Sequence, residues 1–251
     1  MSVLPWTASE GPLPIVAFGN SLGAVQASWG PLLHELGGSR ATLTFDLPGH
    51  YDESIAPFDF DKMAEDVAQT IRAHSDAPVV LCGVSLGGAL AVRVAADHPE
   101  LACAVVVVNA PVAQPDPALW HARARAIDEH GLEPFAETLH ERWFSADAEP
   151  SMIEAVRADF RALPAAGYAN ACRAIADLDI RDAASRVSVP AVIVRAADDI
   201  AVAASNSDEL ATLIPHSHLI HVPGAHLLPA ENPRAVIDAI DMAIALIEET
   251  S

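Results

Sequence analysis

The sequence is poor in cationic side chains. Its 251 residues include 14 Lys and Arg residues against 34 Asp and Glu residues, and Lys62 is the single lysine. The formal net charge of -20 repels polyanions, so nucleic acid and anionic membrane surfaces are disfavoured as partners. The same field repels a small anionic ligand. A carboxylated substrate would therefore need a local cation, and arginine has to supply it.

Cysteine is also scarce. Cys82, Cys103 and Cys172 are odd in number and lack the spacing of metal ligands, so we expect neither a disulfide framework nor a zinc site. Three histidines, His216, His218 and His221, lie close together in the sequence. No carboxylate or cysteine lies near them at the spacing of metal ligands. We expect no metal, and we interpret the three cysteines as buried or half-buried thiols.

Long apolar runs are missing as well. No segment stays apolar long enough to span a bilayer, and residues 1–12 lack the basic start and apolar stretch of a secretory signal. We therefore expect no membrane association and a cytoplasmic location.

Apolar residues are nevertheless plentiful, at 51% of the chain, and they are grouped in short runs that alternate with helical patterns. Continuous runs of this length are typical of parallel strands that are buried on both faces. The alternation predicts an α/β fold with a mostly parallel sheet covered by helices on both faces. The expected strands are residues 15–18, 41–45, 79–82, 104–108, 191–194 and 219–222.

The strand rhythm stops between residues 112 and 178, where helical stretches rich in Ala, Arg and Glu take over. Pro111, Pro115 and Pro117 cluster at the start of this segment, where proline favours a connection over a helix interior. We predict a core formed by residues 1–111 and 179–251, with residues 112–178 inserted as a helical cap.

One strand-to-turn-to-helix segment carries a G-x-S-x-G pattern. Gly83-Val84-Ser85-Leu86-Gly87 follows the expected strand 79–82 and precedes a helical stretch. A sharp turn of this kind needs small residues beside the serine and leaves the hydroxyl exposed at the end of the strand. The pattern predicts that Ser85 is a nucleophile, whereas a lone pattern of this kind also occurs by chance as a turn serine.

A serine hydroxyl requires a base, and the base requires an orienting acid. In α/β-hydrolases the chain order is nucleophile, acid, histidine, with the last two on loops after late strands. His226 follows the expected strand 219–222, and Asp198 and Asp199 follow strand 191–194. We assign His226 as the base and prefer Asp199 over Asp198 as the acid, although Asp198 could exchange roles with it.

A tetrahedral intermediate also requires two hydrogen-bond donors for its oxyanion. The backbone N–H of Leu86 stands at the start of the expected helix and is the first candidate. The second donor should come from the loop after an early strand. Asn20-Ser21-Leu22-Gly23 follows strand 15–18, which makes the Leu22 N–H the candidate.

The chain resembles the 3-oxoadipate enol-lactonases of aromatic catabolism, which are α/β-hydrolases with a helical cap. The resemblance covers nearly the whole chain. It is strongest in residues 20–23, in Glu141-Arg142-Trp143-Phe144, and from Gly167-Tyr168-Ala169 through Cys172 to Asp179. It implies an α/β-hydrolase fold, a place in the β-ketoadipate pathway and a small carboxylated substrate.

Trp120 and Arg123 also resemble a cap segment of this family. The resemblance implies that Arg123 pairs with the substrate carboxylate and that Trp120 walls the pocket, whereas both could simply support the cap.

One loop departs from the family pattern. Residues 48–54 place Tyr51 where the family usually has glycine, which bears on substrate identity.

The expected function is hydrolysis of a small carboxylated enol-lactone by Ser85, His226 and Asp199, without a cofactor. The sequence leaves two alternatives open. One is a carboxylesterase or carbon–carbon-bond hydrolase or lyase on the same scaffold, because a fold and a triad do not fix a substrate. The other is a catalytically silent ligand-binding protein, which the complete triad disfavours. The oligomeric state is left open.

Overall fold

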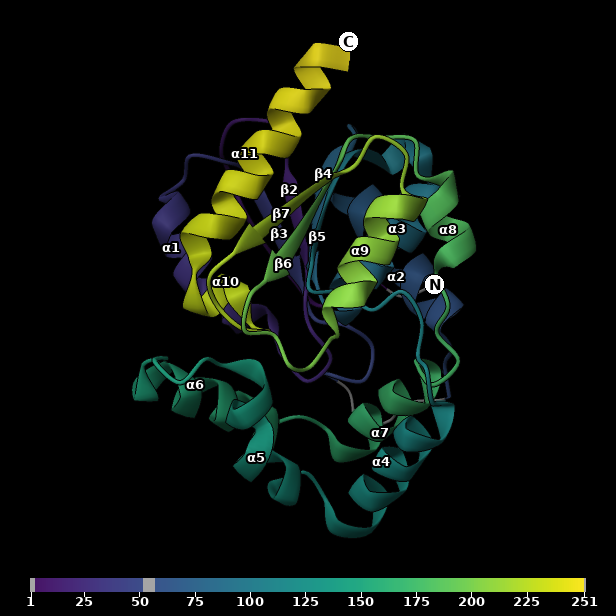
Figure 1. The fold of residues 1–251 in the computed structure, drawn as a ribbon, viewed down its shortest axis with the longest axis vertical. Coiled ribbons are helices and arrows are strands. Elements are labelled where there is room, and N and C mark those ends of the chain that lie inside the picture. Colours follow the sequence, from purple (N-terminus) through teal and green to yellow (C-terminus); the bar gives the residue numbers. More distant parts are fainter. Residues whose placement is uncertain (1–2, 52–56, 251) are drawn as a thin grey trace.

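The computed structural model describes residues 3–51 and 57–250. Its centre is a seven-stranded sheet with the order β1-β3-β2-β4-β5-β6-β7 (Figure 1). All neighbouring strands are parallel except β1 and β3, which are antiparallel. The strands are β1 (Trp6–Ser9), β2 (Val16–Gly19), β3 (Thr42–Phe45), β4 (Val79–Val84), β5 (Ala102–Val108), β6 (Ala191–Ala196) and β7 (His218–Val222).

The structure has the predicted mostly parallel sheet covered by helices on both faces, and each of the six expected strands overlaps an observed one within about two residues. The central strands are buried on both faces, which explains their continuous apolar sequence. In β4, Val79 and Leu81 pack on one side of the sheet, and Val80 and Cys82 pack on the other.

Two groups of helices cover the two faces (Figure 1). One face packs against α1 (Gly30–Leu36), α10 (Leu228–Glu231) and α11 (Pro233–Thr250). The other packs against α2 (Phe60–His74), α3 (Leu86–Asp97), α8 (Arg181–Arg186) and α9 (Ala204–Leu213). Two short 3₁₀ helices complete the core, η1 (Gln26–Trp29) and η2 (Pro99–Leu101).

Strand β1 is an element that the sequence patterns did not predict. All four of its residues are exposed, so it has no apolar run to reveal it. Its position is set by backbone pairing with β3, from Trp6 opposite Phe45 to Ser9 opposite Thr42. It forms the edge of the sheet farthest from β7.

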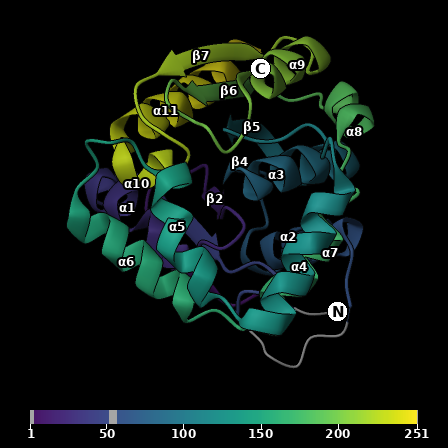
Figure 2. The same ribbon diagram turned by 60° about the horizontal axis from the view of Figure 1, so that its bottom comes forward.

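Four helices lie between β5 and α8, beyond the carboxyl ends of the strands (Figures 1 and 2). They are α4 (Pro117–His130), α5 (Glu133–Trp143), α6 (Pro150–Arg161) and α7 (Ala165–Ala174). The two ends of this segment are joined, because Gln114 N donates to Leu178 O at 2.9 Å and Ile180 N donates to Val112 O at 2.8 Å. We call residues 112–178 the cap segment; its standing as a separate domain remains a prediction.

Within residues 3–51 and 57–250, no helix combines the length and the apolar character needed to cross a membrane.

Candidate active site

Ser85 occupies the sharp turn between β4 and α3. Its backbone has φ 55° and ψ -117°, a left-handed conformation that is rare for a residue with a side chain. The turn is possible because three segments of backbone, at Gly19, Gly83 and Gly87, pack in direct contact. A methyl group on Gly83 would overlap the backbone of Gly87, and one on Gly87 would overlap that of Gly19. The structure thus holds Ser85 at the carboxyl end of β4.

His226 and Asp199 lie side by side at the ends of the neighbouring strands β7 and β6. The Nδ1–H of His226 donates to Asp199 Oδ2 at 2.9 Å, and both side chains are almost fully buried. Asp199 Oδ1 accepts from the backbone N–H groups of Ala201 at 2.7 Å and Val202 at 3.1 Å. These bonds fix the carboxylate and leave His226 Nε2 as the unprotonated nitrogen. Asp198, the alternative acid, is exposed.

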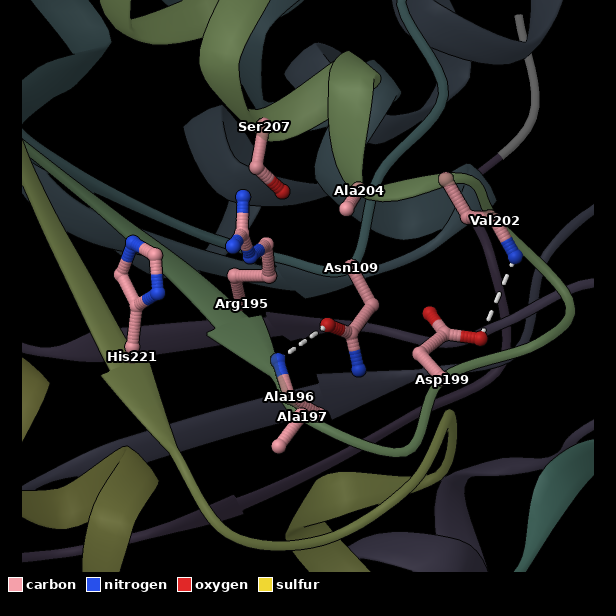
Figure 3. Close-up of a pocket in the computed structure, with 9 residues that line it drawn as sticks. All are labelled: Asn109, Arg195, Ala196, Ala197, Asp199, Val202, Ala204, Ser207 and His221. Carbon is pink, nitrogen blue, oxygen red and sulfur yellow. Dashed lines mark hydrogen bonds between the residues drawn. The ribbon is translucent and has the colours of Figure 1, made fainter.

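Asn109, at the end of β5, ties these strand ends together (Figure 3). Its Oδ1 accepts from Ala196 N at 2.9 Å, and its Nδ2 donates to the carbonyls of Ala225 and His226, both at 3.1 Å. Asn109 is buried and has φ 48°, a left-handed conformation that asparagine tolerates better than most residues. The side chain therefore fixes the backbone from which the His226 imidazole projects.

We expect Asn109→Asp to lower kcat by about 10- to 100-fold with little change in KM. Aspartate keeps the left-handed backbone and the acceptor for Ala196, but it replaces two donor contacts with repulsion between oxygens. Steady-state kinetics and a thermal melt of the same preparation check this. If Asn109 serves stability alone, the melting temperature would fall while kcat of the folded enzyme stays near wild type.

The cap segment forms another wall around His226. Trp143 O accepts from Leu227 N at 3.0 Å, and the Trp143 ring centroid lies 6.4 Å from that of His226. Glu231 Oε2 accepts from Ser145 N at 3.3 Å and from Ala225 N at 3.2 Å. The histidine loop is therefore held by the core and by the cap segment together.

The two residues that carry the predicted oxyanion donors line the same cavity as Ser85. Neither Leu22 N nor Leu86 N donates to an acceptor within the described residues. The Leu22 loop is also close to the imidazole, since Ser21 Oγ lies 3.5 Å from His226 Nε2. Both N–H groups are thus available to a ligand, and their role as oxyanion donors remains a prediction.

His50 fixes the loop that carries Leu22. Gly23 N donates to His50 Nε2 at 2.8 Å, so this nitrogen carries no proton and Nδ1–H donates to Pro48 O at 3.2 Å. Burial lowers the pKa of His50 below its usual value, which favours this neutral form. Residues 52–54 of the same loop, which depart from the family pattern, lie outside the described residues.

A cavity of about 710 Å³ lies between the core and the cap segment. Its lining includes Ser85 and His226 from the core and Trp120, Arg123 and Arg142 from the cap segment. The volume falls within the range of small-molecule sites, which is about 300–1,000 Å³. The predicted nucleophile, base, oxyanion donors and substrate-binding residues therefore share one cavity.

Arg123 is enclosed by aromatic rings within this cavity. Its guanidinium carbon lies 5.8 Å from the ring centroid of Trp120, 5.1 Å from Phe135 and 5.5 Å from Tyr168. Its Nε is buried and has no hydrogen-bond partner within the described residues. Because Arg123 also lines the cavity, its guanidinium is suited to an anionic ligand.

Nearby Cys172 offers no competing nucleophile, because burial raises the pKa of its thiol to about 12. The histidines at 216, 218 and 221 are exposed, and no group of three potential metal ligands occurs in residues 3–51 and 57–250. A second, smaller cavity of about 210 Å³ is lined by nine residues, among them Asn109, Arg195, Asp199 and His221 (Figure 3).

Several contributors to the site escaped sequence reasoning. Asn109 directly follows an expected strand, and this position could have marked it as a candidate. Its hydrogen-bond partners lie 87 to 117 residues away in the sequence, so its contacts could not be predicted. His50 belongs to a motif already noted, and Arg142 belongs to a stretch already quoted for its family resemblance. Glu231 carried no signal, because a lone glutamate on a helix is usually solvated.

The chain is 28% identical over 240 residues to 3-oxoadipate enol-lactonase 2 of Acinetobacter baylyi, covering 94% of this chain and 90% of that protein. It is 30% identical over 200 residues to a pimeloyl-[acyl-carrier protein] methyl ester esterase of Chromobacterium violaceum, covering 73% of this chain and 75% of that protein.

Among solved structures, the enol-lactonase from Burkholderia xenovorans LB400 superposes with a TM-score of 0.88 at 26% identity, covering 95% of this chain and 96% of that one. The resemblance to enol-lactonases inferred from the sequence is confirmed. Residues 17–233 match the family described as the alpha/beta hydrolase fold. This protein belongs to the α/β-hydrolase family.

Proposed function

We propose that this protein opens a small carboxylated enol-lactone, similar to 3-oxoadipate enol-lactone, to a 3-oxo acid. Its family and its enol-lactonase relatives make it a hydrolase of ester or lactone bonds. The observation that carries the proposal is the bond from His226 Nδ1–H to Asp199, which leaves Nε2 basic in the cavity that holds Ser85 and Arg123.

In the first half of the reaction, His226 Nε2 takes the proton of Ser85 Oγ as the hydroxyl attacks the ring carbonyl. The N–H groups of Leu22 and Leu86 stabilise the oxyanion. The carbon–oxygen bond of the ring then breaks, and the enolate leaves with the proton from His226. The enol then becomes a ketone, at position 3 counted from the free carboxylate, while the acyl group is still attached to Ser85.

In the second half, water gives a proton to His226 and attacks the acyl-enzyme. Collapse of the second tetrahedral intermediate releases Ser85, which recovers its proton from His226. The product carries a new carboxylate at the former ring carbonyl. Asp199 keeps the imidazole oriented and stabilises its charged form through both halves.

Arg123 supplies the cation that a net charge of -20 makes necessary for an anionic substrate. The guanidinium of Arg123, which lines the cavity, would donate to the carboxylate already present on the lactone. The aromatic rings around the guanidinium shield this contact from water and strengthen it. Trp120 would form part of the apolar wall.

We expect Arg123→Gln to raise KM for the carboxylated lactone about tenfold and to change kcat by less than about twofold. The matched control is Arg125→Gln, which alters an exposed arginine on the same helix that does not line the cavity. Initial-rate kinetics of both variants check this. Equal KM values in the two variants would rule out the carboxylate role of Arg123.

The proposed reaction is tested with freshly generated 3-oxoadipate enol-lactone, followed by the loss of its ultraviolet absorbance. A neutral aryl ester is assayed in parallel. Lactone opening with a kcat/KM well above that for the ester supports the proposal. Ester cleavage without lactone opening would favour the alternative ester hydrolase, for which the similarity to the methyl ester esterase is the supporting observation.

A further inference from the structure

Most cationic side chains of this protein form ion pairs with carboxylates, but a few do not. All 14 Lys and Arg residues lie in the described part of the chain. Three of them have no carboxylate partner there: Arg123, Arg125 and Arg142. The other eleven form ion pairs: Arg40, Lys62, Arg72, Arg93, Arg157, Arg161, Arg173, Arg181, Arg186, Arg195 and Arg234.

Two of these three unpaired arginines, Arg123 and Arg142, line the large cavity. Among the described residues of its lining, Asp116 is the one carboxylate, and it accepts from Ala118 N as the N-cap of α4. A chain with 34 acidic and 14 basic residues therefore has a cavity lined by more cations than anions. The cavity lining thus carries the opposite charge to the chain as a whole, which indicates an anionic ligand.

The two arginines come from different walls of the cavity. Arg123 is on α4 among aromatic rings, whereas Arg142 is exposed near the end of α5. The next residue in the chain is Trp143, whose ring packs near His226 and whose carbonyl accepts from Leu227 N. The backbone of Arg142 is thus fixed on the wall that borders the histidine.

We propose that Arg142 is a second carboxylate-binding residue of the cavity, so that the site recognises molecules with two carboxylates, one at each arginine. This inference rests on the proposed function. Hydrolysis there converts a lactone with one carboxylate into a product with two, and the new, negatively charged carboxylate forms at Ser85. Arg142 compensates that charge and also draws the anionic substrate toward the cavity.

The test uses direct binding, so that its outcome does not depend on the lactone being hydrolysed. Adipate and hexanoate have the same chain length and differ in one carboxylate. Their affinities for the whole protein are measured by isothermal titration calorimetry at neutral pH and low ionic strength. We expect adipate to bind about fivefold more tightly than hexanoate, and added salt to reduce the difference.

Three variants locate the effect. Arg142→Gln should remove the adipate preference and leave hexanoate affinity within about twofold, because an exposed arginine contributes one ion pair. Arg123→Gln should weaken both ligands. Arg125→Gln, which removes the third unpaired arginine, should change neither. Circular dichroism confirms that each variant is folded.

Two results would overturn the inference: equal wild-type affinities for adipate and hexanoate, or an adipate preference that survives Arg142→Gln as fully as Arg125→Gln. The proposed function fails on a different measurement, the absence of lactone opening. An adipate preference that depends on Arg142 in a protein without lactonase activity would retain the two-carboxylate site and reassign the substrate to another dicarboxylate ester.

Discussion

Ser85→Ala is expected to lower kcat/KM for both lactone and ester by at least about 10⁴-fold. Alanine removes the attacking oxygen but keeps a Cβ at the left-handed turn, so the backbone of the elbow experiences the same strain. The fold should therefore persist, with a melting temperature close to that of the wild type.

Initial rates together with a serine-directed phosphonate test this. The wild type should form a covalent adduct whose mass increase maps to Ser85, and the alanine variant should form none. A variant that still opens the lactone at more than about a tenth of the wild-type rate would contradict a serine nucleophile. It would instead indicate direct attack by water that His226 activates.

The second large effect concerns the choice between two adjacent carboxylates. Asp199→Asn is expected to lower kcat by about 10³- to 10⁴-fold, because an amide can donate to Nδ1 and so stabilise the wrong tautomer of His226. Asp198→Asn is the matched control. Asp198 is exposed, and its backbone N–H, which the substitution leaves intact, donates to Gly224 O.

Full pH–rate profiles of both variants check the assignment. Asp199→Asn should lose activity across the neutral range, whereas Asp198→Asn should remain within about twofold of the wild type. The opposite ranking would transfer the acid role to Asp198. It would also require a different arrangement of the β6 loop from the one in which Asp199 accepts from Ala201 and Val202.

The parts of this fold with strong local signals were predictable from the sequence. The central strands are buried on both faces, so each is a short apolar run, and Ser85 lies in a turn whose glycines are required by backbone contact. Strand β1 was missed for the opposite reason, since its four residues are exposed and its place is fixed by pairing with β3.

The supporting contacts of the site could not be predicted in the same way. The bonds from Asn109 to Ala196 and to the His226 loop join segments that are distant in the sequence, and Glu231 bridges the core and the cap segment. Such contacts depend on how the packed elements approach one another. Asp199 contacts His226, whereas Asp198, which follows the same strand, is exposed; the acid role of Asp199 remains a prediction.

The His226 loop is held by both the core and the cap segment, and this limits how the cap can be exchanged for that of another enzyme. Trp143 and Ser145 belong to the cap segment, and their bonds to Leu227 and Glu231 reach the loop that carries His226. The cap segment makes these contacts with backbone atoms, Trp143 O and Ser145 N, so a chimera keeps them only if the foreign cap brings a carbonyl and an N–H to the same positions. A cap transferred to this core would therefore have to match its histidine loop, so that substrate specificity and the alignment of His226 change together.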